Sequence, residues 1–308
     1  MSLFLGIDTS NYTTSVALCG DKEVNLRKII EVKKGQRGIR QSDGVFLHLK
    51  ELPCQIESLD ADLKDISAVG VSVKPRNRED SYMPVFTAGS GFARVIAKTL
   101  GVPLFETSHQ DGHIMAGIIS CGAEELINEE FTAVHLSGGT TEILLCRYEN
   151  GSFNAKIVGG TKDISAGQLL DRLGVRLGMK FPCGKELDAL SLTTDKVINI
   201  KPSESGGFFN FSGAETKLLK LSDTEDAAVL ARTALLFAAN SINEALKTAA
   251  AGKVLFVGGV ASNTILREMF SKAQYKAYFA SPELSCDNAV GVSYIAKKMY
   301  EEGCGWSR

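Results

Sequence analysis

The 308-residue sequence lacks a Cys-X-X-Cys pair, and its seven cysteines are scattered singly. This odd, dispersed set argues against a disulfide framework and against a zinc site built from thiolates, and it favours a reducing compartment. Uncharged apolar runs stay short of the about 18 residues that indicate a membrane helix, and the chain begins as a strand instead of a targeting segment. We therefore expect a cytoplasmic protein with no membrane association.

Neither sign of charge is in excess, because 34 Lys and Arg face 36 Asp and Glu and leave a formal net charge of −2. The whole molecule therefore does not attract nucleic acid, and RNA binding would depend on local patches or on a partner. Two basic clusters qualify, although such runs are more often solvated loops. They are Lys33, Lys34, Arg37 and Arg40, and Lys74, Arg76 and Arg78. The length suits two domains of about 150 residues, and the composition excludes a disordered chain.

Histidine is scarce as well: two of only four histidines, His109 and His113, occur together directly after the strand-like run 102–105. On a helix they would project from one face, one turn apart. Two neutral imidazoles suit Zn, Fe or Mn, and a tight site needs further ligands from elsewhere in the chain. The alternative is a structural pair at a helix N-terminus, hydrogen-bonded to the backbone and to Asp111.

The two halves of the chain follow a similar plan. Apolar runs at 3–7 and 14–19 predict a hairpin with Asp8 at its mouth, followed by a third strand. Runs at 132–136 and 142–148 repeat this pattern around a Ser-Gly-Gly turn. We interpret the repetition as two related α/β domains whose Gly, Ser and Thr turns hold the phosphates of a nucleotide from two sides. Chance similarity between two hairpins is the alternative.

Further segments carry specific expectations. A helix over 45–59, after a polar loop over 36–44, would bury Phe46, Leu49, Leu52 and Ile56. The Gly-, Ser- and Phe-rich stretch 201–212 is expected to be a binding loop. Strand 253–257, followed by two glycines, would bring backbone close to a ligand at a helix N-terminus.

Seven short motifs, in order along nearly the whole chain, resemble those of the tRNA threonylcarbamoyl transferase family (TsaD-like proteins, formerly described as O-sialoglycoprotein endopeptidases). They are Leu5-Gly6-Ile7-Asp8-Thr9-Ser10, His109/Gly112/His113, Leu136-Ser137-Gly138-Gly139, Ala166-Gly167 to Asp171, Phe211-Ser212-Gly213, Gly258-Gly259-Val260-Ala261-Ser262-Asn263 and Cys286-Asp287-Asn288-Ala289. The resemblance implies an α/β fold of the actin, sugar-kinase and chaperone-ATPase type. We expect two duplicated domains, residues 1–108 and 109–308, with a nucleotide cleft between them and the final helix packed back on the first.

The resemblance also implies a metal site. His109, His113 and Asp287 fall on the family's metal ligands, although Asp287 could instead be an N-cap at the start of the last helix. His135 falls where archaeal members have a metal-binding Tyr and is a further candidate ligand. Fe, Zn or Mg would act there as a Lewis acid on threonylcarbamoyl-AMP.

Candidate nucleotide and catalytic residues follow in the same way. The phosphate-holding turn corresponds to Ser137, Gly138 and Gly139, and the sugar and base contacts correspond to Asp171, Gly184 and Asn263. Asp8 and Ser10 of the first motif are the candidate catalytic residues. The implied ligand is ATP or threonylcarbamoyl-AMP, and the implied acceptor is the N6 amine of a tRNA adenosine beside the anticodon. Partner proteins of the threonylcarbamoylation machinery are expected, and a dimer is left open.

The sequence departs from the family in four segments, at residues 11–13, 42–48, 74–80 and 213–216, the last of which inverts a charge at Glu215. A kept metal and nucleotide pocket among changed substrate-side segments favours a diverged paralogue. The alternative function is therefore a non-catalytic nucleotide-binding scaffold that acts in a complex with related proteins. A metalloprotease is disfavoured because Gln110 stands where zincins have Glu. A sugar-kinase-like reaction through Asp8 would not require the histidine pair.

Overall fold

The computed structural model describes residues 2–10, 12–30, 39–78, 80–249, 252–285 and 288–304. The candidate ligand Asp287 and the basic residues Lys33, Lys34 and Arg37 lie outside these ranges. Two compact units make up the chain: unit 1 comprises residues 1–124, 148–154 and 286–308, and unit 2 comprises residues 125–147 and 155–285. The sequence suggests a boundary after residue 108, whereas unit 1 continues to residue 124 because the helix that starts at His109 packs against the last helix.

Unit 1 is built on a five-stranded sheet with strand order β3-β2-β1-β4-β5. Its strands are β1 (Leu3–Asp8), β2 (Thr13–Gly20), β3 (Val24–Ile29), β4 (Ile66–Lys74) and β5 (Leu104–Ser108). The predicted hairpin is present, since β1 pairs with β2 in antiparallel register with Asp8 opposite Ser15. β4 pairs in parallel with both β1 and β5, so these three strands end at the same edge of the sheet.

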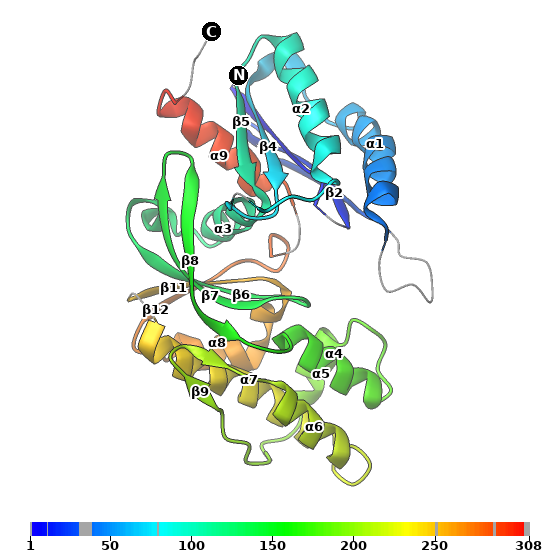
Figure 1. Cartoon of the computed structure of the whole chain (residues 1–308), viewed down its shortest axis with the longest axis vertical. Helices are drawn as coiled ribbons and strands as arrows, with labels where there is room; N and C mark the ends of the chain where they lie inside the picture. Colours follow the sequence, from blue (N-terminus) through cyan, green and yellow to red (C-terminus); the bar gives the residue numbers. More distant parts are fainter. Residues whose placement is uncertain are drawn as a thin grey trace. The chain divides into compact units, whose positions relative to one another are not determined.

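Two pairs of helices cover the two faces of this sheet (Figure 1). α1 (Gln41–Glu57) and α2 (Phe86–Leu100) lie on one face, where Gly89 of α2 approaches Ile7. α3 (His109–Ser120) and α9 (Val290–Glu301) lie on the other, where Ser293 packs over Gly6. Because alternate residues of a strand point to the same face, Asp8 shares the face of Gly6, on the side of α3 and α9.

Glycines let α9 pack with backbone contact against both the sheet and α3. A Cβ added at Gly6 would lie 2.6 Å from the Ser293 nitrogen, and one at Gly291 would lie 2.7 Å from the Ala116 nitrogen. Side-chain carbons do not approach backbone atoms this closely, so neither position tolerates a side chain without displacement of α9. The last helix is therefore held tightly against the end of β1 that carries Asp8.

α1 starts inside the expected loop, and its buried face only partly matches the prediction, because Leu52 is buried and Ile56 packs against the core while Phe46 and Leu49 are exposed. Its buried residues are Gly44, His48, Leu52 and Gln55. Phe46 and Leu49 of the predicted face are instead 60% and 45% exposed. The reason is that β2 presents Thr14, whose hydroxyl lies 2.8 Å from His48 Nδ1 and whose carbonyl accepts from the Gln55 amide at 3.0 Å. Hydrogen bonding to a buried polar strand residue thus selects the buried face.

Unit 2 repeats the strand order of unit 1. Its seven-stranded sheet has the order β12-β11-β6-β7-β8-β10-β9. The strands are β6 (Phe131–Leu136), β7 (Thr141–Glu149), β8 (Ser152–Thr161), β9 (Glu204–Ser205), β10 (Phe208–Phe209), β11 (Lys253–Val257) and β12 (Lys276–Phe279). β6 is antiparallel to β7 and parallel to β11, as β1 is to β2 and β4. The predicted α/β fold with a duplicated sheet plan is therefore confirmed.

Five α-helices complete unit 2 among the described residues: α4 (Ala166–Arg176), α5 (Gly184–Ser191), α6 (Ser212–Leu221), α7 (Ala227–Ala249) and α8 (Thr264–Ser271). Short 3-10 helices are η1 (Leu63–Asp65) in unit 1, η2 (Glu124–Asn128) where the units meet in sequence, and η3 (Gly259–Ser262) in unit 2. The stretch 201–212, expected to be a binding loop, contributes β9 and β10 to the sheet.

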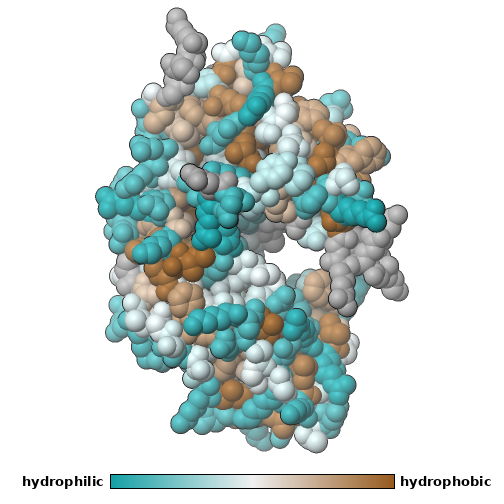
Figure 2. Space-filling view, viewed as in Figure 1, coloured by the Kyte–Doolittle hydropathy of each residue, from teal (hydrophilic) through white to brown (hydrophobic). Residues whose placement is uncertain are grey.

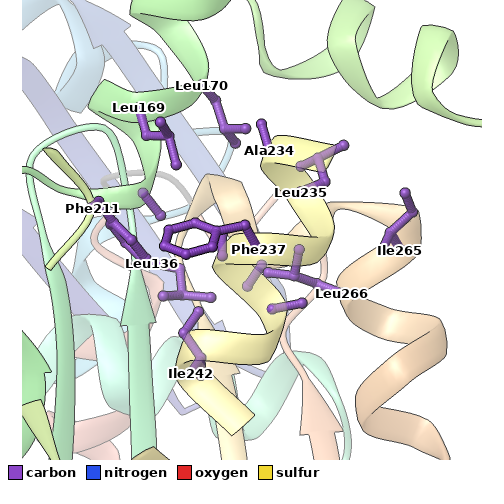
Figure 3. Packing of buried hydrophobic residues seen from close by; sticks show 14 of the residues in the cluster. Leu136, Leu169, Leu170, Phe211, Ala234, Leu235, Phe237, Ile242, Ile265 and Leu266 are labelled. Atoms are coloured by element: carbon purple, nitrogen blue, oxygen red, sulfur yellow. The ribbon is translucent and has the colours of Figure 1, made fainter. Parts of the chain in front are cut away.

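The core of unit 2 is formed by apolar side chains from β6, α4, α7 and α8 and the residue before α6 (Figure 3). They include Leu136, Leu169, Leu170, Phe211, Ala234, Leu235, Phe237, Ile242, Ile265 and Leu266. A fully buried Leu, Ile or Phe contributes about 1.5–3 kcal/mol relative to exposure. α7 runs through this cluster, which accounts for its long apolar sequence and holds the elements that carry the candidate nucleotide residues.

The face drawn in Figure 2 is a mosaic in which hydrophilic residues surround smaller hydrophobic areas. Such a surface is ordinary for a globular domain. None of the helices in the described ranges combines the length and the apolar character needed to cross a bilayer.

We expect unit 1 to become less stable as pH decreases, because of His48. Burial lowers the pKa of His48 from 6.5 to about 4, against the opposing effect of Asp8. Between these values the unfolded chain binds a proton that the folded chain excludes. The contribution is therefore complete above about pH 6.5 and is lost as pH falls through about 4, by about 3 kcal/mol.

Thermal melts between pH 7.5 and 4.5 measure this effect in the wild type and in His48→Gln, which keeps a hydrogen-bonding group but does not titrate. The variant should lose less stability than the wild type over the same interval. Parallel pH profiles for the two proteins would contradict the assignment.

Candidate functional site

α3 begins where β5 ends, and its first turns carry both histidines. Ser108 caps the helix: its hydroxyl accepts from the Asp111 nitrogen at 3.1 Å, and the Asp111 carboxylate accepts from the Ser108 nitrogen at 3.2 Å. This reciprocal capping box fixes the start of the helix. The rings of His109 and His113 lie side by side with centroids 4.4 Å apart, on one face as the spacing predicts.

A buried carboxylate contacts His109, which in turn contacts His113. Asp8 is 1% exposed, and its Oδ2 lies 2.6 Å from His109 Nδ1. His113 Nε2 lies 3.0 Å from His109 Nε2. The three side chains thus form the contact chain Asp8–His109–His113. Asp8 and His109 are 101 positions apart in sequence. They meet because parallel strands β1, β4 and β5 end at one edge of the sheet.

The contact with Asp8 determines the tautomer of His109. A carboxylate accepts a hydrogen bond, so the imidazole proton is on Nδ1, and in the neutral ring Nε2 carries the lone pair. That nitrogen faces His113 Nε2. Metal-binding imidazoles are commonly held in this way, with the second ring nitrogen donating to a carboxylate. The donor set therefore fits a divalent metal held by the two Nε2 atoms.

Within the described ranges, no group of three or more His, Cys, Asp or Glu side chains is arranged so that it could hold a metal ion by itself. This part of the chain offers two imidazole ligands, and the third candidate, Asp287, lies outside it. His135, the fourth candidate, lies in unit 2, where its Cδ2 is 3.2 Å from a Cβ built at Gly258. Its ring is thus beside the glycine turn that follows β11.

The carboxylate of Asp111 serves the backbone and not the histidine pair. Besides capping α3, it accepts from Thr107 Oγ1 at 3.1 Å, Ser152 Oγ at 3.2 Å and the Phe153 nitrogen at 3.1 Å. Burial raises the pKa of Asp111, and these hydrogen bonds oppose the rise. His109 Nδ1 contacts Asp8, whereas the Asp111 carboxylate accepts from Thr107, Ser108, Ser152 and Phe153.

The turn after β1 holds Asp8 in position. The Ser10 nitrogen donates to Asp8 Oδ1 at 2.9 Å, and Thr9 Oγ1 donates to the Val85 carbonyl at 3.0 Å. Ser10 is 3% exposed, yet its hydroxyl lacks a hydrogen-bond partner in the part of the chain that the structure describes. A buried polar group without a partner costs about 1–3 kcal/mol. The Ser10 hydroxyl is thus available to a ligand that reaches Asp8.

In unit 2 the turn after β6 is fastened to the start of α4. Ser137 and Thr140 close the turn: the Ser137 nitrogen donates to the Thr140 carbonyl at 2.9 Å, and the Thr140 nitrogen donates to Ser137 Oγ at 3.0 Å. Ser165, the N-cap of α4, donates to the Gly138 carbonyl at 2.7 Å. A Cβ at Gly167 would lie 2.5 Å from the Gly138 Cα. The turn is therefore rigid and lies at a helix N-terminus, where anions are favoured.

The other side of this turn is open. A Cβ built at Gly138 or Gly139 would meet no described atom within 4 Å, and the same holds for Gly184 and Gly259. β6 and β11 are adjacent parallel strands, so the two glycine turns that follow them lie at the same edge of the sheet. Ligands of open α/β sheets bind at the carboxyl ends of strands. The geometry suits the phosphates of a nucleotide.

The remaining nucleotide candidates already take part in structural hydrogen bonds. Asp171 of α4 accepts from the Cys183 nitrogen at 2.8 Å, just before α5. Asn263 caps α8 by accepting from the Leu266 nitrogen at 3.1 Å, and its amide donates to Asp188 at 2.6 Å. One oxygen of Asp171 and one N–H of Asn263 thus remain for a ligand.

Asp188 is a residue that sequence reasoning missed. Its carboxylate also accepts from the nitrogen of Thr264 at 3.1 Å and from its hydroxyl at 2.9 Å, so it joins α5 to the start of α8. The available signal was its position four residues after Gly184, which places it on the same face of α5.

Two acidic side chains of unit 2, one of them in the departing segment 213–216, are satisfied internally. Glu215 of α6 is 9% exposed and pairs with Arg172 of α4 at 3.0 Å. Asp163 accepts from the backbone nitrogens of Phe211 and Ser212 at 2.8 and 3.0 Å, at the start of α6. Burial raises the pKa of Asp163, but these hydrogen bonds prevail and lower it to about 2. The charge inverted at Glu215 therefore fastens α6 to α4.

The two-sheet plan with these turns defines a class, the actin-like and sugar-kinase-like ATPase folds. The chain superposes on HypF of T. kodakarensis with a TM-score of 0.61 and 14% identity, covering 98% of this chain and 48% of that one. It superposes on a ROK family glucokinase of Streptomyces griseus, solved with glucose and AMPPNP, with a TM-score of 0.51 and 11% identity, covering 96% and 99%. These likenesses concern the fold alone.

Within this class, the model of the tRNA N6-adenosine threonylcarbamoyltransferase family matches residues 53–294, and the chain belongs to that family. The tRNA N6-adenosine threonylcarbamoyltransferase of Thermus thermophilus is 29% identical over 97% of this chain and 93% of its own length. A probable bifunctional tRNA threonylcarbamoyladenosine biosynthesis protein of Thermoplasma acidophilum is 26% identical, and the chain spans 57% of its length. The family generally depends on a metal and ATP, binds tRNA and works with partner proteins.

We expect Asp8→Asn to weaken metal binding because the amide no longer holds the Nδ1 proton of His109. Replacing a carboxylate that orients a metal-binding histidine typically costs about 10- to 100-fold in affinity. Competition with a chelating dye measures the affinity. Nitrogen-15 spectra of the metal-free protein report which ring nitrogen of His109 is protonated. An unchanged tautomer and affinity would refute the role given to Asp8.

Two neighbouring glycines offer a matched pair of substitutions in unit 2. Gly138→Ala places a methyl group in open space on the ligand side of the turn, so it should weaken nucleotide binding at an unchanged melting temperature. Gly167→Ala forces a methyl group into the turn itself. It should reduce the free energy of unfolding by about 1–3 kcal/mol and thereby lower the melting temperature. Calorimetric titration with ATP and thermal melts test both variants. Equal effects of the two on binding and melting would argue against a ligand at the open side.

Proposed function

We propose that the protein transfers a threonylcarbamoyl group from threonylcarbamoyl-AMP to the N6 amine of a tRNA adenosine beside the anticodon. In this reaction the amine nitrogen forms a bond to the carbamoyl carbon, the bond from that carbon to the phosphate oxygen breaks, AMP departs and the amine loses a proton. Membership of a family named for this transfer supports the proposal. The structural observation that supports it is the contact chain Asp8–His109–His113, in which the two Nε2 atoms of the histidines face each other and could bind a metal ion together.

The adenylate is assigned to unit 2. The rigid turn Ser137–Gly139 would hold its phosphate with backbone nitrogens at the N-terminus of α4, where the helix dipole favours negative charge. Asp171 and Asn263 each keep one hydrogen-bonding group for the sugar and base. Asp188 is a further candidate, because it sits between the elements that carry Gly184 and Asn263.

The metal is assigned to His109 and His113 of unit 1, with Asp287 and His135 as further candidate ligands. A bound divalent ion, Fe, Zn or Mg, would supply a Lewis acid that polarises the carbamoyl carbonyl. Asp8 acts through His109, so we assign it as a positioning residue that keeps the Nδ1 proton in place. The buried Ser10 hydroxyl, which lacks a described partner, is the candidate for direct contact with the transferred group. Both residues are thus given separable roles.

The proposal extends to the setting of the reaction. The six described cysteines are all free, in keeping with the reducing cytoplasm expected from the sequence. Partner proteins would supply or hold part of the machinery, as the family generally requires.

Transfer to RNA tests the proposal directly. The purified protein is incubated with a divalent metal, an extract that contains the partner proteins, radiolabelled threonylcarbamoyl-AMP and unmodified tRNA. The radioactivity incorporated into the RNA is then counted. We expect transfer by the wild type and a loss of at least about 100-fold in His109→Ala/His113→Ala, because removal of both imidazoles removes the metal. The matched control is His48→Gln, a buried histidine of the same unit outside the site.

Metal content and ATP binding are measured on the same samples. One outcome is that the protein binds nucleotide without any transfer under conditions in which the Thermus thermophilus relative transfers the group. That result would reject the proposed enzyme activity in favour of a nucleotide-binding scaffold. Full metal content in the double variant would remove the site assignment.

A further inference from the structure

We propose that Lys74, Arg76, Arg78 and Tyr82, in the segment between β4 and α2, form an RNA contact beside the histidine pair. The cationic side chains would bind backbone phosphates, and Tyr82 would stack on an unpaired base of the acceptor loop. This inference rests on the proposed function, since it says how unit 1 holds the RNA acceptor. We refer to these four residues as the β4–α2 cluster.

The cluster begins at the end of β4, beside the start of the helix that carries the histidines. Lys74 ends β4 and is the strand partner of Ser108, the residue before His109. The Gln110 nitrogen donates to the Pro75 carbonyl at 3.0 Å. The segment from β4 to α2 consequently runs past the start of α3 (Figure 1). A group bound to these cations would thus lie close to the metal ligands.

Backbone atoms and neutral side chains contribute to the anchoring of the segment. The Asn77 side chain donates to Ser152 Oγ at 2.7 Å, and that hydroxyl donates to the capping carboxylate of Asp111 at 3.2 Å. The Arg76 nitrogen donates to Ser81 Oγ at 3.0 Å. These anchors use backbone atoms and neutral side chains, so Lys74 and Arg78 are presented from a fixed backbone. Less entropy is lost on binding when the contact is pre-organised in this way.

The local charge suits a phosphate chain. Three cations of the segment outnumber its two acids, Glu79 and Asp80, in a protein whose net charge is −2. Neither Lys74 nor Arg78 forms an ion pair in the described part of the chain. Because the molecule as a whole does not attract nucleic acid, a local excess of cations gives the RNA a defined place to bind. The segment is also one of the four in which the sequence departs from the family.

Tyr82 adds a feature that points to single-stranded RNA. It is 68% exposed, and its nitrogen is held by the Asp80 carbonyl at 3.1 Å. An exposed aromatic ring next to arginines is the usual platform for an unstacked base, and anticodon loops present such bases. The chemistry therefore favours RNA as the partner.

The binding of a fluorescein-labelled RNA hairpin carrying the anticodon loop, measured by anisotropy between about 50 and 200 mM KCl, tests the inference. The slope of log affinity against log salt should become shallower by about 1.5 in Lys74→Gln/Arg78→Gln, because each lost phosphate contact removes about 0.7–0.9. Tyr82→Ala should bind about tenfold more weakly with an unchanged slope, whereas Tyr82→Phe should bind as the wild type does. Lys98→Gln, an exposed lysine at the other end of α2, is the matched control and should leave affinity and slope unchanged.

Several outcomes would overturn the inference. They are a wild type that does not bind the hairpin, cluster variants with wild-type affinity and slope, and an equal loss in Lys98→Gln. ATP binding and metal content should stay at wild-type values in the cluster variants. If loop-dependent RNA binding is found but no transfer occurs, the inference stands and the proposed function fails. If transfer occurs and the cluster variants perform it as the wild type does at limiting RNA, the function stands and the inference fails.

Discussion

The backbone contact between α9, the sheet and α3 is the constraint on which unit 1 depends. Gly6 and Gly70 lie on the two central strands under α9, and Gly291 lies on α9 against α3. A Cβ at Gly70 would lie 2.6 Å from the Val292 carbonyl, so even a methyl group would lift the helix from the sheet. Because α3 and α9 are packed against each other and over the carboxyl end of β1, the histidines of α3 are pressed toward Asp8. The last helix of the chain thereby fixes a site formed by the first strand.

The two units use one strand plan to build two different turns. In unit 1 the turn after β1 is closed by side-chain contacts. Thr9 Oγ1 donates to the Val85 carbonyl, and Asp8 is buried against His109. In unit 2 the equivalent turn after β6 contains Gly138 and Gly139, which leave backbone groups open on one side. A buried carboxylate can orient a ligand through a low-dielectric contact, whereas open glycines allow an anion to approach the backbone. Side-chain size at one turn thus separates a closed turn from an open one.

The sequence predicts best what depends on local spacing. Strand pairs, the histidine helix and the repeat of the hairpin follow from short-range patterns, and the structure contains all of them. The pairing of Asp8 with His109 spans 101 residues and depends on which strands end at one edge, so spacing pointed to Asp111 as the alternative partner. The buried face of α1 was predicted only in part: Leu52 is buried as expected, but His48 and Gln55, which contact Thr14, are buried where Phe46 and Leu49 were expected.

The departures from the family show the same limit. Residues 42–48 and 213–216, expected to be altered substrate-side segments, lie within α1 and α6, and Glu215 is paired with Arg172. A charge read from sequence has no partner until the fold supplies one. Asn263 likewise has two structural duties, the cap of α8 and the bond to Asp188, which a motif match does not reveal.

The hydrogen bond between the Gln110 nitrogen and the Pro75 carbonyl has a consequence for how the protein can change over evolutionary time. It is made by main-chain atoms, so it survives substitution of most side chains on either partner. Side chains after β4 can therefore be exchanged while the backbone next to the histidines keeps its course. If the proposed function holds, acceptor choice and metal geometry would be separately mutable, and a duplicated gene could acquire a new acceptor without passing through an inactive centre.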